Sequence, residues 1–143
     1  MEPWRIAVVE EAKTWLGTPW IHRARIKGVG VDCAQLLIGT YSGAGLVEPF
    51  DTGDYPMDWM LHKEEERMLA WVDKYLEPVT ATQPGDAVIL KFGRAFSHAA
   101  IVTDWPVVIH AFRKERGVVW GNMTLGDLSR HEARYYTPRK VPA

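Results

Sequence analysis

Residues 28–38, GVGVDCAQLLI, hold the only cysteine of the chain, Cys33, and place it where a glycine-rich loop gives way to an apolar run. The two glycines of this stretch permit a tight turn, and the spacing of the apolar residues after it predicts a helix. Asp32 suits the N-cap of that helix, and Gln35 follows three residues later, the arrangement of a capping box. Cys33 is therefore expected in the first helical turn.

A cysteine in that position has two interpretations. Unpaired backbone N–H groups and the positive end of the helix dipole favour a thiolate, which would lower the pKa of Cys33 and make it a nucleophile. The neighbouring negative charge of Asp32 opposes this. The alternative is a buried structural cysteine, which behaves as a small apolar residue. This stretch alone leaves both open.

The composition predicts one globular domain covering residues 1–143. The chain is 47% hydrophobic and 24% charged, enough to build a core. Its formal net charge of −1 provides no basic field for nucleic acid or for an anionic membrane. A single cysteine excludes an internal disulfide framework. No apolar run has the length of a membrane span or the pattern of a signal peptide.

The order of the predicted elements indicates an α+β fold in which helices precede a small antiparallel sheet. Residues 47–60 contain prolines and glycine and are expected to be irregular, able to fold over a cleft. The other elements are predicted from apolar residues at helical spacing and from short β-like runs separated by turns. Helices are predicted over 3–16, after Cys33 and over 61–76, and strands over 87–92, 98–103, 107–112, 117–121 and within 133–139.

Two of the five histidines lie in apolar, strand-like runs. A turn centred near Asp104 would place His98 and His110 directly opposite each other on one face of a hairpin, with Cβ atoms roughly 5 Å apart. Catalysis by a cysteine needs a base within hydrogen-bond reach and a polar group that orients the base. Cys33, His98 and His110 can fill these roles in that order. A zinc site from the same residues would lack a fourth ligand.

The remaining histidines divide between a loop and charged surroundings. His22 belongs to a basic loop over residues 21–31, which either faces water or forms one rim of a site near Cys33. His62 and His131 lie in charged sequence contexts and are assigned no role.

As an ordered set, five motifs resemble the NlpC/P60 family of papain-like cysteine peptidases, and within it the branch found in phage tails and related tail-like particles. The resemblance covers nearly the whole chain. Its motifs are WLGTPW at 15–20, GVGVDCAQL at 28–36, PGD at 84–86, SHAAI at 97–101 and IHA at 109–111.

The resemblance implies a papain-like fold and hydrolysis of stem peptides in bacterial cell-wall peptidoglycan, typically between D-glutamate and a diamino acid. By position, Cys33 matches the nucleophile, His98 the general base and His110 the third polar residue. No cofactor or metal is implied. The substrate-binding residues expected around this set are Trp20, His22, Asp32 and Ser97.

The chain departs from the family pattern at two places. Trp20 stands where the family often has a tyrosine, and an indole can donate but not accept a hydrogen bond. Ala34-Gln35 replaces the usual Ser-Gly. Two alternatives therefore stay open: a structural or binding component of a phage tail tip with little activity, and a cysteine amidase acting on another amide.

The expected partner is the peptidoglycan stem peptide, with phage tail-tip proteins as further candidates, and neither nucleic acid binding nor membrane insertion is expected. Without a signal peptide, the chain is expected to be made in the cytoplasm. It would then reach the cell wall on a phage or tail-like particle, or through lysis.

Overall fold

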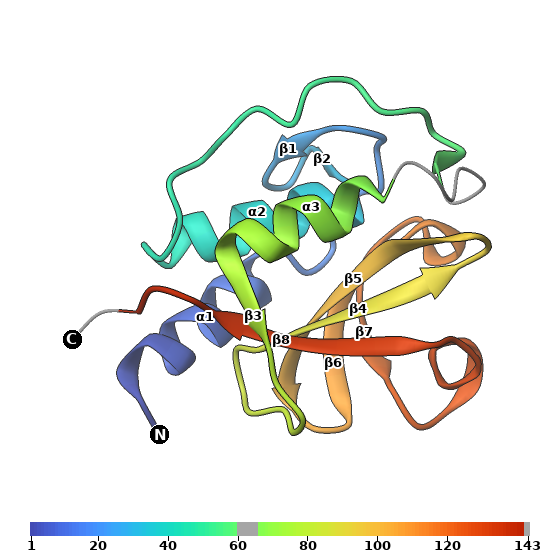
Figure 1. Cartoon of the computed structure of the whole chain (residues 1–143). Coiled ribbons are helices and arrows are strands. Elements are labelled where there is room, and N and C mark those ends of the chain that lie inside the picture. Colours follow the sequence, from blue (N-terminus) through green and yellow to red (C-terminus); the bar gives the residue numbers. More distant parts are fainter. Residues whose placement is uncertain (60–65, 142–143) are drawn as a thin grey trace.

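The computed structural model describes residues 1–59 and 66–141. Helices occupy one side of the molecule and an antiparallel sheet the other (Figure 1). No helix in this part of the chain is long and apolar enough to cross a membrane. The helical elements are α1 (Pro3–Thr14), α2 (Cys33–Gly43) and α3 (Arg67–Tyr75), with short 3-10 turns η2 (Arg113–Glu115) and η3 (Gly126–Arg130).

The main sheet has six strands in the order β3-β8-β4-β5-β6-β7, and all neighbouring pairs are antiparallel. A separate two-stranded hairpin, β1 with β2, precedes α2. The strands are β1 (Arg25–Ile26), β2 (Gly30–Val31), β3 (Leu76–Pro78), β4 (Ala87–Phe92), β5 (Ala95–Asp104), β6 (Val107–Phe112), β7 (Gly117–Asn122) and β8 (Ala133–Pro138).

Each face of the sheet packs against a different apolar cluster. On the helix side, fully buried residues such as Val8 of α1 and Leu36 of α2 meet Ile101 and Ile109 of the sheet. The opposite face is covered by a smaller cluster that includes Leu128 of η3. Strands buried on both faces read as apolar runs without alternation, as the β4, β5 and β6 sequences do. This sheet is the rigid support beneath the first turn of α2.

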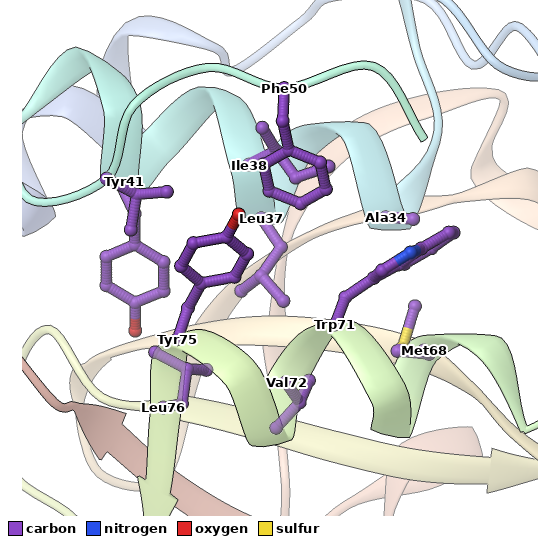
Figure 2. A pocket seen from close by; sticks show the side chains of 11 residues that line it. Ala34, Leu37, Ile38, Tyr41, Phe50, Met68, Trp71, Val72, Tyr75 and Leu76 are labelled. Atoms are coloured by element: carbon purple, nitrogen blue, oxygen red, sulfur yellow. The ribbon is translucent and has the colours of Figure 1, made fainter. Parts of the chain in front are cut away.

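The second and third helices enclose a small apolar cavity of about 30 Å³ (Figure 2). Leu37 of α2 and Trp71 of α3 face each other across it, and Phe50 stacks on Tyr75 with ring centroids 4.9 Å apart. The lining is apolar, so a water molecule there would lack the polar partners it needs. We interpret this cavity as loose packing between two helices, with no chemistry of its own.

The α+β class predicted from the sequence is confirmed, with shifts at element boundaries. The helix predicted over 3–16 ends at Thr14, before Gly17, whose φ is +84°. The strand predicted over 98–103 extends in both directions to become β5. Hairpin β1–β2 and strand β3 were not predicted, because two- and three-residue strands carry too few residues to show a period. Positions 61–65 of the predicted third helix, with His62, lie outside the described residues.

The predicted register between the histidine-bearing strands is wrong by two residues. In the β5–β6 hairpin Ile101 pairs with Ile109 and Val102 with Val108, and an irregularity follows before Asp104. His98 and His110 are therefore diagonal neighbours and are not directly opposite. An even shift leaves the side chains on the same face, since side-chain direction repeats every two residues.

Candidate active site

The first turn of α2 holds Cys33 against the sheet. The Asp32 carboxylate accepts a hydrogen bond from the backbone N–H of Gln35 at 3.0 Å, which confirms the predicted N-cap. The Cys33 side chain is buried, and its Sγ donates to the backbone carbonyl of Ser97 at 3.2 Å. The thiol is thus fixed at the meeting point of α2 and β5.

A β-bulge creates the acceptor for this thiol. Leu90 of β4 pairs with His98, but the next residue, Lys91, pairs with Phe96, so Ser97 is an extra residue on β5. Bulges bend a strand and redirect its groups, and they are common beside active sites. Here the bulged residue presents its carbonyl to Cys33, directly before His98.

The two strand histidines form a hydrogen-bonded pair. Nε2 of His98 and Nδ1 of His110 lie 2.8 Å apart, and both rings are buried. Phe92 stacks on the His98 ring at a centroid distance of 4.4 Å and an interplanar angle of 15°. Because this hydrogen bond occupies Nε2 of His98, Nδ1 is the nitrogen available for proton exchange with another group.

A glycine on the neighbouring strand makes room for the second histidine. A Cβ atom at Gly121 of β7 would lie 2.9 Å from Nε2 of His110 and 2.8 Å from Cδ1 of Leu128. Real Cβ atoms essentially never approach so closely. The missing side chain at Gly121 therefore leaves the space that the His110 ring occupies, which the sequence pattern did not indicate.

Cys33 and His98 open into the same cavity, of about 180 Å³. His110 does not line it and reaches the site through His98. All four residues predicted to bind substrate do line it: Trp20, His22, Asp32 and Ser97. The lining residues that the sequence analysis missed are Met57, Trp59, Phe92, Ala111, Phe112, Arg113 and Lys114.

Two groups of these missed residues had a weak sequence signal. Met57 and Trp59 belong to the irregular segment predicted to fold over a cleft, and the segment does cross above α3 and the β1–β2 hairpin (Figure 1). Arg113 and Lys114 follow His110 by three and four residues. If His110 is the third catalytic residue, these two must also lie near the site. The exact wall they form depends on η2, which no periodicity predicts.

Tyr55 anchors the irregular segment to the start of α2. Its hydroxyl donates to Oδ2 of Asp32 at 2.6 Å and accepts from Nε2 of Gln35 at 3.2 Å. Its ring meets that of His22 edge to face, with centroids 5.1 Å apart. Asp32 also accepts from the backbone N–H of Arg23 at 2.8 Å. Both carboxylate oxygens of Asp32 are therefore engaged within the protein.

Burial determines the protonation states of the catalytic candidates. It raises the pKa of the Cys33 thiol, with a further rise from the negative charge of Asp32, and the N–H groups of Ala99, Ala34 and Cys33 only partly offset this. The thiolate expected from the helix dipole is thus not the resting form. Burial also lowers the pKa of His98 well below its usual value, and that of His110 to about 4.

The resting site therefore contains a neutral thiol beside two neutral imidazoles. No group of three or more metal-binding side chains is arranged to hold an ion anywhere in residues 1–59 and 66–141. The arrangement can perform proton transfer and nucleophilic attack once a ligand enters the cavity.

Comparison with solved structures identifies the architecture. The NlpC/P60 domain of the peptidoglycan hydrolase SagA superposes with a TM-score of 0.62 at 19% sequence identity, covering 91% of this chain and 96% of that domain. The fold is that of an NlpC/P60 domain. Neither a protein-family model nor a curated protein sequence matches the chain.

Two longer proteins contain the same NlpC/P60 fold. An NlpC/P60 family protein from Bacillus cereus matches with a TM-score of 0.62 and 21% identity, and NlpC1 from Trichomonas vaginalis with a TM-score of 0.67 and 14% identity. The match to the Bacillus cereus protein covers 94% of this chain and 40% of that protein, and the match to NlpC1 covers 90% of this chain and 41% of that protein. The chain thus corresponds to about two fifths of each.

Proposed function

We propose that this chain is a cysteine peptidase that hydrolyses stem peptides of bacterial peptidoglycan, at a bond of the D-glutamyl–diamino acid type. The observation that carries the proposal is the Cys33 thiol and the His98–His110 pair at one cavity of an NlpC/P60 fold. SagA, a structural neighbour, is described as a peptidoglycan hydrolase, which supports this substrate class.

The reaction begins when substrate displaces the resting hydrogen bond of the thiol. The Cys33 proton moves to Nδ1 of His98, and the imidazolium donates through Nε2 to Nδ1 of His110, 2.8 Å away. Because the pKa of His110 is about 4, that ring stays neutral near pH 7 and can accept this hydrogen bond. His110 thereby orients His98 and stabilises its charged form.

The thiolate then attacks the scissile carbonyl carbon and forms a carbon–sulfur bond. The developing oxyanion is stabilised by backbone N–H groups at the start of α2, near Ala34. As the carbon–nitrogen bond breaks, His98 returns the proton to the leaving amine and leaves a thioester. Water, deprotonated by His98, attacks the thioester, releases the carboxylic acid and regenerates the thiol.

Digestion of purified sacculi tests the proposal. The native chain should release stem-peptide fragments whose masses reveal the bond cleaved, and Cys33→Ala should release none while retaining the native circular dichroism spectrum. Equal release by a folded Cys33→Ala variant would remove Cys33 as the nucleophile.

The alternatives keep the fold and change its use. A tail-tip component with little activity would bind sacculi without cutting them, and a cysteine amidase would leave sacculi intact but cleave other amides in a Cys33-dependent manner. Association with a phage tail, and the route to the cell wall, remain predictions from the sequence resemblance.

A further inference from the structure

The charged side chains around the active-site cavity differ in whether partners within the protein already occupy them. Besides Cys33 and His98, four charged or titratable groups line the cavity: Asp32, His22, Arg113 and Lys114. The single carboxylate, that of Asp32, already accepts hydrogen bonds from two backbone N–H groups and from the Tyr55 hydroxyl. The carboxylate offers little to an incoming cation.

The two cationic side chains, Lys114 and Arg113, also differ in whether they have a partner within the protein. Lys114 pairs with Asp127, with Nζ and Oδ2 3.2 Å apart, and Arg130 shares this carboxylate, so the charge of Lys114 is partly balanced within the protein. Arg113 is exposed, and among the described residues its guanidinium has no acidic partner. It lies over the Trp20 ring, 5.4 Å from the centroid. The contact with Trp20 restrains the guanidinium, and no residue in 1–59 or 66–141 accepts a hydrogen bond from its N–H donors.

We propose that Arg113 is a specificity-determining residue that binds a free carboxylate on the substrate, close to the scissile bond. A planar guanidinium with unused donors matches a carboxylate through two parallel hydrogen bonds. Trp20, beneath Arg113, lines the same cavity as Cys33, so the carboxylate would belong to a residue adjoining the bond that Cys33 attacks. This inference rests on the proposed function. Stem peptides with a free carboxylate on the residue next to the scissile bond are the preferred substrates, and counterparts in which that carboxylate is amidated are poor ones.

The experiment compares two synthetic stem peptides that differ only in a carboxylate or carboxamide on the residue preceding the scissile bond. The native chain should cleave the carboxylate form with kcat/KM roughly tenfold higher or more, as expected for hydrogen bonds to a charged group. Arg113→Gln should remove this preference by raising KM for the carboxylate form with kcat little changed. Lys140→Gln, an equal change of charge at an exposed C-terminal position, should leave the preference intact.

Binding to Cys33→Ala, measured by calorimetry, separates the two proposals. Tighter binding of the carboxylate form, lost in the double variant with Arg113→Gln, without turnover by the native chain, would refute hydrolysis and retain the role of Arg113. Equal cleavage or equal binding of both peptides would overturn the role of Arg113, as would a uniform loss for both in Arg113→Gln. Absence of both binding and turnover would overturn both proposals.

Discussion

Cys33 occupies an environment in which two effects of opposite sign compete. The helix start supplies N–H groups that favour a thiolate, whereas burial and Asp32 favour the thiol and raise its pKa. Burial prevails, since solvation of the anion is lost and only partly replaced. The sequence placed the residue correctly but could not give its burial, which depends on the bulge at Ser97 in a different element.

This balance predicts slow alkylation of the native thiol. At pH 7 iodoacetamide should modify Cys33 more slowly in the folded chain than in the same chain unfolded in urea, where an ordinary cysteine pKa near 8.5 applies. The folded rate should keep rising as the pH is raised beyond 9. The unfolded chain is its own control, because the reagent and the thiol are the same. A faster reaction of the folded chain at pH 7 would mean that the thiolate is stabilised at rest.

The position of the histidine pair depends on how strands β5, β6 and β7 pack beside one another. The sequence indicated that His98 and His110 share a face, and their hydrogen bond agrees with this. The register could not be read from the sequence, because the hairpin turns at Trp105-Pro106, later than the predicted centre near Asp104, and an irregularity between Val102 and Asp104 then shifts the pairing by one residue. The sequence also gives no sign of the role of Gly121, which follows from its closeness to the His110 ring on the neighbouring strand.

Gly121→Ala should therefore impair turnover through displacement of His110. The new methyl group must push aside the His110 ring or Leu128, and we expect a loss of about 1–3 kcal/mol in stability from overpacking. Turnover per folded molecule should fall roughly tenfold or more, since the orientation of His98 depends on His110.

Gly39→Ala provides the matched control. Its Cβ would lie 2.6 Å from Cζ2 of Trp15, away from the histidine pair, so it should also destabilise the chain. Its turnover per folded molecule, measured at a temperature where both variants are folded, should remain near the native value. If Gly121→Ala behaves in the same way, the position of His110 does not control activity.

For the whole molecule, the α+β class was predictable from the sequence, but the walls of the cavity beside Cys33 were not. Cys33, Trp20 and His22 could be grouped because they lie close together in the sequence. The opposite wall comes from the irregular segment that carries Trp59 and from η2, which carries Arg113. The irregular segment is tied to the start of α2 by the hydrogen bond from Tyr55 to Asp32 across 23 residues, and no periodicity encodes such a contact.

Burying two neutral histidines beneath one cavity should also make the stability of the whole chain depend on pH. In the unfolded chain each histidine binds a proton as the pH falls through about 6.5, whereas burial keeps the folded-state pKa of His98 well below that value and that of His110 at about 4. The unfolded state therefore binds more protons in this range, so stability falls as the pH is lowered from about 7 toward 4. For His110 alone the loss should be about 3 kcal/mol.

Urea unfolding at pH 7 and at pH 4.5 measures this loss directly. His110→Gln keeps a polar side chain beside His98 but does not titrate, so its free energy of unfolding should change less between the two pH values than that of the native chain. His131→Gln replaces a half-buried histidine outside the pair and should retain most of the native pH dependence, because His131 is the smallest of the three causes that lower the pKa of His98. A native stability that is the same at both pH values would mean that the folded chain accommodates protonated histidines at the site. In that case His110 could not act as the neutral acceptor that the proposed proton transfer requires.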